Sequence, residues 1–504
     1  MSQNIQISSI ELLTRLREEG VSIWEEAGNL RYKAPKGSLA PEDLQMLREQ
    51  KAEIVALLQK EAQPVEVVPD PAARFTPFPL TDVQSAYLLG RYELFGYGGV
   101  ACHIYLELDY EQLDPVRVEE VWNQLIARHD MLRATIDSDG QQRVMAEVPR
   151  FKVPYTDTSM LDKAKAGSAL EAIRENMGHR VYDTDKWPLY GIAVTKTADR
   201  AVLHVSMEFL IADWASIWLL LSEFETLYKE PGKRLPELPI TFRDYVLTER
   251  TLRETVAYSR DKAYWLSRID DLPQTPDLPL AKGEVEAGKA RFRREFIRLD
   301  AAKWDVFKQR AQKRGLTPTA AVMTAYAAVI ERWSRNRAFS LNLTLLNRQP
   351  LHDRVQDIVG DFTSVSLLAV DWGAERSFQG RAKAIQKQLF EDLDHRLYSG
   401  VEVMREVARR RGREAALMPI VFTSAIGLVG IAEGERLSGK IGEYGISQTP
   451  QVFIDCQAMD SAEGLQVNWD VREGVFPEKM VDDMFAAFAD LLQALVESEQ
   501  RWEE

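Results

Sequence analysis

The chain has 504 residues, of which 45% are hydrophobic and 28% are charged, so it can bury a large core as a globular protein. A formal net charge of −14 argues against a general binder of nucleic acid or of anionic membranes. The two cysteines, Cys102 and Cys456, exclude a cysteine-rich zinc site and fit a reducing cytoplasm. The first residues are too polar for a signal peptide. The most apolar run, 415–432, is interrupted by Pro419 and by polar residues, which favours a buried strand and a loop over a membrane span.

Residues 1–60 form a small unit in which the order helix, hairpin, helix is predicted. The apolar residues between positions 12 and 16 mark the first helix, and the alternating segment "VSIWEEAGNLRYKAP" (21–35) predicts a hairpin. A stripe of apolar residues from 44 to 58 predicts one long helix after Pro41. So small a unit buries little surface by itself, so we expect it to dimerise or to dock onto another chain.

Residues 61–74 carry several prolines and few core residues, which is typical of a semi-rigid linker. The sequence that follows predicts a large mixed α/β structure. A strand is expected in 201–212, and a helix with one apolar face is expected in 216–230. A proline-rich stretch, 271–280, is expected to cross between two lobes.

Several common kinds of chemistry lack their motifs in this chain. There is no P-loop, no dinucleotide fingerprint and no G-x-S-x-G nucleophile elbow. The six histidines form neither H-E-x-x-H nor H-x-H, so we expect no metal site. The spacing of the residues leaves a Ser-His-Asp triad open, although no motif marks its nucleophile.

A series of motifs in residues 75–495 resembles a known family. The motifs are "FPLTDVQSAYLLGR" (78–91), "RHDMLR" (128–133), "EFLIADWAS" (208–216), "LPQTPDLPL" (272–280), "TPTAAVMTAYAAVIERWS" (317–334), "GDFTSVSLL" (360–368), "PIVFTSAIG" (419–427) and "ISQTPQVFIDCQ" (446–457). In this order they resemble the heterocyclization domains of nonribosomal peptide synthetases, a branch of the condensation-domain superfamily. The segment "GVSIWEEAGNLRYKAPKGSL" (20–39) resembles the tubulysin-type N-terminal docking domain of such synthetases.

The resemblance implies an α/β fold with two lobes, like that of chloramphenicol acetyltransferase, preceded by a small α/β docking domain. We expect the first lobe in 75–250 and the second in 251–504. The implied reaction joins an upstream carrier-bound acyl thioester to a carrier-bound cysteine, serine or threonine, and then closes a thiazoline or oxazoline ring with loss of water. No cofactor is implied within this chain, because the phosphopantetheine belongs to the carriers.

The implied partners are other parts of a synthetase. Upstream they are a C-terminal tail and an acyl carrier protein, and downstream they are peptidyl carrier and adenylation domains. The positive charges of Arg31, Lys33 and Lys36 in the predicted hairpin could attract an acidic tail, and the edge of the hairpin could accept a peptide strand. The basic run "RRRGR" (409–413) is interpreted as a solvated helix end, with a contact to an acidic carrier as the alternative.

The segment "EFLIADWAS" takes the place of the H-H-x-x-x-D-G motif of ordinary condensation domains. Heterocyclization domains have D-x-x-x-x-D-x-x-S here, and this chain has Glu208, Asp213 and Ser216 at these positions. Asp213 precedes a predicted helix, so we interpret it as an N-cap, with an electrostatic role at the site as the alternative. Ser216 is interpreted as a hydrogen-bonding residue of the helix end, and Glu208 as the partner of a buried arginine.

The resemblance places the ring-forming centre at Asp455 and Thr423. Asp455 ends the apolar segment "QVFID", so partial burial is expected to raise its pKa and let it hold a proton near neutrality. The alternative is a buried structural aspartate. Asn347 and Gln451 are weaker candidates for positioning the amide carbonyl. Two other functions stay open: a plain condensation enzyme that does not close rings, and an inactive docking scaffold.

Overall fold

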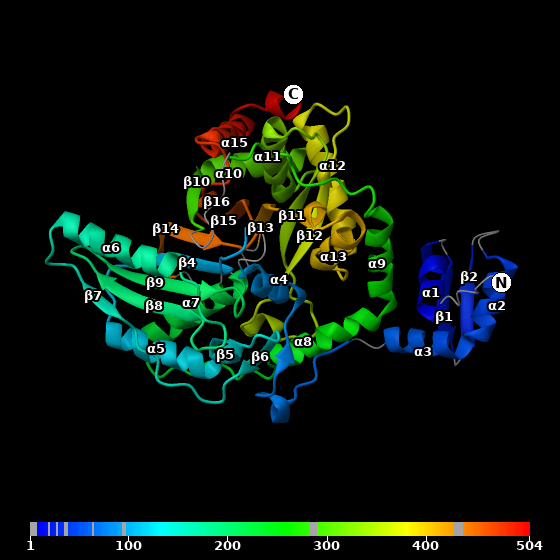
Figure 1. Ribbon diagram of the computed structural model, residues 1–504, viewed down its shortest axis with the longest axis horizontal. Helices are drawn as coiled ribbons and strands as arrows, with labels where there is room; N and C mark the ends of the chain where they lie inside the picture. The colour runs from blue at the N-terminus through cyan, green and yellow to red at the C-terminus, as the bar shows by residue number, and fades with distance from the viewer. Residues whose placement is uncertain are drawn as a thin grey trace.

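The structure is a computed structural model, shown in Figure 1. It describes residues 8–18, 21–26, 29–34, 39–62, 65–92, 97–281, 290–427 and 437–504. In these ranges no helix is both long enough and apolar enough to cross a membrane. The apolar run 415–432 contributes the strand β13 (Ile420–Ala425), while its last residues lie outside the described part.

The N-terminal unit has the predicted order of helix, hairpin and helix, but its last helical segment is divided. Its elements are α1 (Ser9–Glu18), β1 (Ser22–Glu26), β2 (Asn29–Lys33), α2 (Pro41–Glu49) and α3 (Lys51–Ala62). The single long helix predicted after Pro41 is therefore wrong. The chain leaves the helix at Gln50, whose side chain accepts a hydrogen bond from Ser9 Oγ at 2.8 Å. The break lets Leu47 of α2 and Ile54 of α3 share one core with the leucines of α1.

This unit rests on the larger body through one helix, α9 (Val256–Arg268). Val256 is 2% exposed and belongs to the same apolar core as Leu12 and Leu16 of α1. Figure 1 shows the unit to one side of the molecule, with α1 facing α9.

The first large sheet has five strands in the order β14-β4-β9-β8-β7. Their bounds are β4 (His103–Tyr110), β7 (Tyr155–Asp157), β8 (Tyr190–Lys196), β9 (Ala201–Glu208) and β14 (Lys440–Gln448). The helices α5 (Pro115–Arg128) and α7 (Trp214–Lys229) supply the apolar core on one face, and α6 (Lys163–Gly178) lies on the other. A small sheet of β3 (Phe78–Pro79), β6 (Gln141–Val144) and β5 (Ala134–Ile136) lies beside α4 (Asp82–Gly90) and α8 (Phe242–Thr251).

The second large sheet has six strands in the order β10-β16-β15-β13-β11-β12. Besides β13, its strands are β10 (Phe292–Asp300), β11 (Phe339–Leu346), β12 (Thr363–Val370), β15 (Ile454–Ser461) and β16 (Gly464–Arg472). The strands β11, β13 and β15 run parallel, and the other pairs are antiparallel. The core on one face is closed by α10 (Ala301–Lys313), α11 (Pro318–Trp333), α12 (Phe378–Asp394) and α15 (Met480–Glu497). The helix α13 (Gly400–Arg411) packs against α9.

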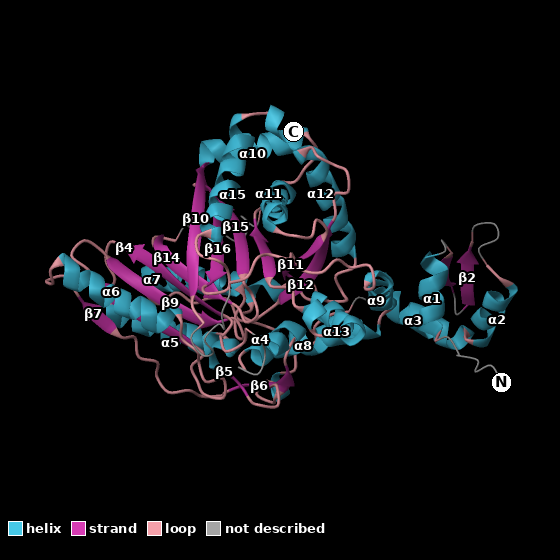
Figure 2. Ribbon diagram, turned by 45° about the horizontal axis from the view of Figure 1, so that its top comes forward, coloured by secondary structure: helices cyan, strands magenta, loops and turns pink. Residues whose placement is uncertain are grey.

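The two sheets meet at an angle, as Figure 2 shows, and the chain crosses between them more than once. The division expected after residue 250 falls in the last turn of α8, which ends at Thr251, and β14 returns to the first sheet and pairs antiparallel with β4. The segment 351–362 also places its apolar side chains in the first core. By pairing with β4, β14 covers an edge that would otherwise expose unpaired backbone groups. The second lobe thus supplies part of the first.

Candidate active site between the two sheets

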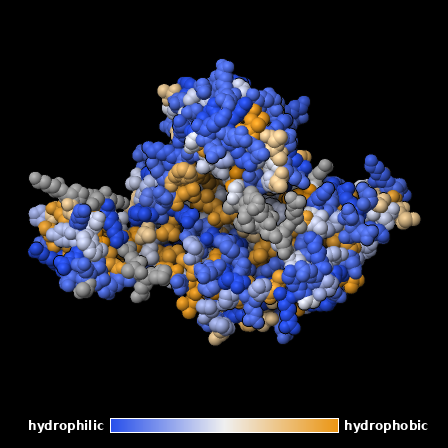
Figure 3. All heavy atoms as spheres, turned by 180° about the vertical axis from the view of Figure 1, so that it is seen from behind, coloured by the Kyte–Doolittle hydropathy of each residue, from blue (hydrophilic) through white to orange (hydrophobic). Residues whose placement is uncertain are grey.

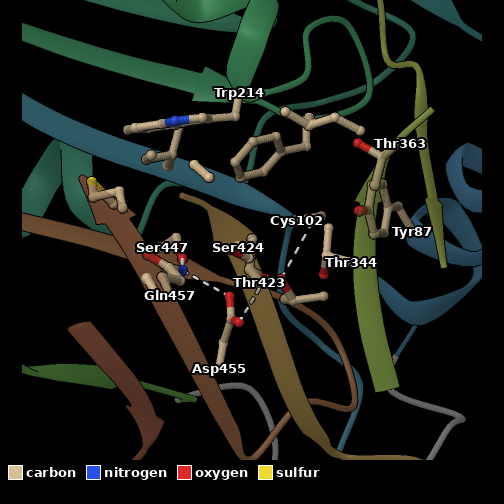
Figure 4. Close-up of a pocket in the computed structure, with 17 residues that line it drawn as sticks. Tyr87, Cys102, Trp214, Thr344, Thr363, Thr423, Ser424, Ser447, Asp455 and Gln457 are labelled. Atoms are coloured by element: carbon tan, nitrogen blue, oxygen red, sulfur yellow. Dashed lines mark hydrogen bonds between the residues drawn. The ribbon is translucent and has the colours of Figure 1, made fainter. Parts of the chain in front are cut away.

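A cavity of about 100 Å³ lies where the ends of the two sheets face each other. Its walls combine apolar side chains with many hydroxyl groups. The lining residues are Tyr87, Cys102, Ile104, Phe209, Trp214, Thr344, Leu346, Thr363, Thr423, Ser424, Ala425, Ser447, Thr449, Asp455, Gln457, Ala458 and Met459. Figure 4 shows Asp455 on one wall and the indole of Trp214 on the opposite wall. Asp455 is the acidic residue of this lining, so it is the candidate acid or base.

Two neighbouring strands hold the carboxyl group of Asp455. Thr423 Oγ1 on β13 donates a hydrogen bond to Asp455 Oδ1 at 3.0 Å, and Gln457 Nε2 donates to Asp455 Oδ2 at 2.7 Å. Side chains alternate along a strand, so Asp455 and Gln457 of β15 point to the same face. Parallel pairing sets Thr423 opposite Gln457, which brings its hydroxyl to the carboxyl. The predicted pair of Asp455 and Thr423 therefore meets in the cavity.

Burial raises the pKa of Asp455 to about 6. The hydrogen bonds from Gln457 and Thr423 and the charge of Arg294 act in the opposite direction, whereas the charge of Asp470 adds to the rise. A carboxyl with this pKa exchanges protons readily near neutrality, which suits a general acid or base.

Glu208, Asp213 and Ser216 are completely buried and do not line the cavity. Asp213 is the N-cap of α7, as predicted, and accepts a hydrogen bond from the backbone N–H of Ser216 at 2.7 Å. Arg348 donates to both side chains, at 3.0 Å to Asp213 Oδ1 and 2.7 Å to Ser216 Oγ. Ser216 Oγ also donates to the carbonyl of Gly360 at 2.8 Å. This network fixes the start of α7, the turn that carries Trp214 into the cavity.

Glu208 has the arginine partner that was predicted. Arg91 Nη1 donates to Glu208 Oε1 at 2.8 Å, and the backbone N–H of Tyr182 donates to the same oxygen at 3.4 Å. Burial raises the pKa of Glu208 to about 7, against the lowering effect of Arg91. The contacts of Glu208, Asp213 and Ser216 support a structural role over a catalytic one.

The two weaker candidates lie outside the cavity lining. Asn347 follows β11, and its side-chain oxygen accepts a hydrogen bond from Gln349 Nε2 at 2.7 Å. Gln451 has a positive φ of 62° in the turn before β15, and its backbone N–H donates to the carbonyl of Tyr97. The polar lining instead includes Gln457, which was not among the predicted site residues. The alternation "D-C-Q" within β15 was the available signal, because it sets Gln457 on the same face as Asp455.

A second cavity of about 50 Å³ shares part of its wall with the first. The shared residues are Ile104, Trp214, Gln457 and Met459. Its other walls come from β4, β10, β14, β16 and α7, and they include the exposed residues Phe296, Arg298 and Ile441. Figure 3 shows an apolar hollow on one face between the upper and lower parts of the molecule.

The predicted docking residues are only partly described. Arg31 and Lys33 are exposed on β2, and Arg31 Nε lies 3.0 Å from Glu26 Oε2 of the adjacent strand. Lys36 lies outside the described residues. In the basic run, Arg409 pairs with Glu406, Arg410 pairs with Asp270, and Arg411 donates to backbone carbonyls. These partners support the interpretation of "RRRGR" as a helix end.

Comparison with known proteins identifies the family. The family model described as Condensation domain matches residues 78–501, and the model described as TubC N-terminal docking domain matches residues 10–60. The chain belongs to the condensation-domain family. The family resemblance that was inferred from the motifs is therefore confirmed, both for the docking domain and for the condensation domain.

Two relatives and one solved structure illustrate the similarity. Pyochelin synthetase PchF of Pseudomonas aeruginosa (strain UCBPP-PA14) is 43% identical over 493 residues, which cover 98% of this condensation-domain chain and 27% of PchF. Phenyloxazoline synthase MbtB of Mycobacterium sp. (strain MCS) is 37% identical over 430 residues, which cover 85% of this chain and 36% of MbtB. The chain thus spans 27% to 36% of the length of these two relatives.

The solved structure is the monoclinic crystal form of the EpoB cyclization-docking bidomain from Sorangium cellulosum. It matches with a TM-score of 0.79 and 36% identity, over 97% of this chain and 99% of that chain. The predicted two-part architecture, a docking domain and a condensation-domain fold, is therefore confirmed.

Proposed function

We propose that this chain is a heterocyclization domain of a nonribosomal peptide synthetase. It condenses an upstream acyl thioester with a carrier-bound cysteine, serine or threonine, and then removes water to form a thiazoline or oxazoline. The observation that best supports this proposal is the position of the Asp455 carboxyl. It faces the cavity between Thr423 and Gln457 and has a pKa of about 6. The names of the relatives, which include an oxazoline synthase and a cyclization domain, support the same reaction.

Asp455 acts in the ring-forming steps. After condensation, the cysteine thiol attacks the carbon of the new amide carbonyl, and a C–S bond forms as the C=O π electrons move to oxygen. The Asp455 carboxylate takes the thiol proton and delivers it to that oxygen. In the next step the hydroxyl leaves as water with a second proton, which comes from the amide N–H, and the C=N bond forms. A positioned group of this kind contributes roughly 10²–10⁴-fold to each proton transfer.

Thr423 and Gln457 keep the carboxyl in place for both transfers. Each donates to a different oxygen of Asp455, so the rotation of the carboxyl is restricted while both oxygens remain near the cavity. Trp214 and Phe209 supply apolar walls, which strengthen electrostatic interactions with the reacting groups by excluding water. Cysteine is the proposed nucleophile, because thiols attack more readily than hydroxyls.

The substrates arrive on carrier arms, and the two cavities together form the proposed path for one arm. The second cavity shares the lining residues Trp214 and Gln457 with the first and is lined by the exposed Arg298, where the phosphate of a phosphopantetheine arm finds a cationic partner in this proposal. The arm belongs to the carriers, and this chain uses no cofactor of its own in the proposed reaction. The proposed partners are an upstream acyl carrier and C-terminal tail and downstream peptidyl carrier and adenylation domains.

The N-terminal unit docks the upstream partner in this proposal. The exposed cations Arg31 and Lys33 lie on a two-stranded sheet, where an acidic tail is attracted and a free strand edge accepts a peptide. Dimerisation through this unit is the alternative use of the same surface. A cytoplasmic location is proposed from the two buried free cysteines.

Intact mass spectrometry of the downstream carrier tests the proposed reaction. A carrier loaded with cysteine is mixed with this protein and with an acyl-loaded upstream carrier. A condensed product that has lost one water supports a heterocyclase, whereas a condensed product that retains it indicates a plain condensation enzyme. Absence of both products with authentic partners indicates a docking scaffold.

A further inference from the structure

A buried ion pair lies behind Asp455 in the second sheet. Strand register sets Arg294 of β10 opposite Asp470 of β16, and Asp470 opposite Asp455 of β15. Arg294 binds Asp470 through two hydrogen bonds, with Nε at 2.7 Å from Oδ1 and Nη2 at 2.6 Å from Oδ2. Asp470 is 1% exposed, so the pair has lost most of its water and depends on its protein partners.

Gln457 connects this pair to Asp455. Its Nε2 lies 2.7 Å from Asp455 Oδ2 and 3.1 Å from Asp470 Oδ2, and Arg294 Nη2 lies 3.5 Å from its Oε1. Arg294 and Asp470 therefore hold the amide group of Gln457 from its two ends. An amide held in this way keeps its N–H directed at the carboxyl of Asp455.

The other sheet contributes one residue to the same group of side chains. Ser447 belongs to β14, where it pairs with Ile104 of β4 in the first sheet. Its hydroxyl and backbone N–H donate to Asp470 Oδ2 at 2.7 Å and 3.1 Å, and its Oγ lies 2.7 Å from Gln457 Nε2. The bonds that orient Gln457 thus span both sheets.

We propose that Arg294 and Asp470 are positioning residues of the ring-forming centre: they orient Asp455 through Gln457, and Ser447 makes this orientation depend on contact between the two sheets. The inference rests on the proposed role of Asp455 in ring formation. It assigns a use to a buried ion pair, a feature that is by itself weak evidence of a contribution to stability. It also explains why these charges lie beside the cavities instead of in the apolar cores.

The two members of the pair act on Asp455 with opposite signs. The negative charge of Asp470 raises the pKa of Asp455, and the positive charge of Arg294 lowers it. Among the described residues, the other titratable groups that interact with Asp455 remain neutral, because burial raises the pKa of each. They are Tyr87 of α4, Tyr326 of α11 and Cys456 of β15.

The test compares Asp470→Asn with Arg294→Met in the complete chain. The readout is the pH at which single-turnover ring formation from a condensed, carrier-bound substrate is half-maximal. We expect this midpoint to fall by about one unit in Asp470→Asn and to rise by about one unit in Arg294→Met. A role limited to stability would lower the yield of both variants and leave both midpoints unchanged, and that result would overturn the proposal.

Asp392→Asn is the matched control. Asp392 is fully buried and paired with Arg268 at 2.6 Å, but it does not line either cavity, so its replacement should destabilise the fold without moving the midpoint.

A milder variant keeps the test informative if the charge variants do not fold. Ser447→Ala removes one hydroxyl and should slow ring formation about 3- to 10-fold relative to condensation, with recovery in Ser447→Thr. An unchanged ratio of the two steps in Ser447→Ala would contradict the proposal. If Asp455→Asn itself forms rings normally, the proposed role of Asp455 fails, and that outcome differs from a failure of the positioning residues alone. If the wild type forms no rings, the proposed function fails.

Discussion

Replacing Thr423 with valine isolates one hydrogen bond of the proposed centre. The two side chains differ mainly in the hydroxyl, which donates to Asp455 Oδ1 at 3.0 Å and stabilises the carboxylate over the acid. A hydrogen bond to a charged group contributes about 1.5–3 kcal/mol, and one pKa unit corresponds to about 1.36 kcal/mol. Its loss should raise the pKa of Asp455 from about 6 by about one to two units.

The sign of the pH dependence follows from the proposed mechanism. Ring formation begins with the carboxylate, so the wild-type rate should fall as the pH decreases through about 6. In Thr423→Val the fall should begin one to two units higher, at about pH 7 to 8. The assay is single-turnover ring formation on a condensed, carrier-bound substrate, quenched at a series of pH values.

Thr344→Val is the control for this experiment. Thr344 lines the same cavity and is the register partner of Thr423 on β11, and the described structure gives it no hydrogen bond to Asp455. Its valine variant should keep the wild-type midpoint. A midpoint in Thr423→Val that is unchanged or lower would refute the assignment of Asp455 as the proton acceptor.

Three further predictions concern the fold and the docking unit. Asp213→Ala removes the N-cap of α7 and the charge partner of buried Arg348, so the free energy of unfolding should fall by about 3–5 kcal/mol; normal urea denaturation with abolished turnover would contradict a structural role. Glu208 has a pKa raised from 4.5 to about 7, so the folded state favours its acid form and its contribution to stability declines as the pH rises between those values. Glu208→Gln should weaken this pH dependence of the stability measured by urea denaturation. An unchanged pH dependence would count against a raised pKa of Glu208 in the folded state. Reversing the charges of Arg31 and Lys33 should weaken calorimetric binding of an acidic tail peptide, and equal affinity would exclude this docking surface.

The sequence predicted the pair of Asp455 and Thr423, which meets in the cavity, but it did not predict the other groups that hold Asp455. Asp455 and Thr423 each lie in a motif of consecutive residues, so a resemblance was sufficient to select them. Gln457 lies two residues beyond Asp455 and could have been selected from strand alternation. Arg294 and Asp470 come from distant strands whose neighbours are set only by the sheet order, which no local pattern specifies.

Two features of the fold also depend on contacts that local sequence patterns do not specify. The apolar stripe from 44 to 58 has a continuous helical period, yet a polar contact of Gln50 with α1 divides it. The strand β14 pairs with β4 across more than three hundred residues of chain, and this long-range choice covers a sheet edge that sequence periodicity does not reveal. Local patterns predicted the element types, whereas long-range contacts decided where they end and which sheet they join.

The most direct test of the account compares wild type with Asp455→Asn by intact mass spectrometry of the downstream carrier. Asp460→Asn is the control, because Asp460 lies on the same strand and contacts Trp304 and Gly427 instead of the cavity. We predict that the wild type and the control give a condensed product that has lost one water. Asp455→Asn should still condense, but its ring formation should be slower by roughly 10²–10⁴-fold. Loss of water by Asp455→Asn at the wild-type rate would contradict the account.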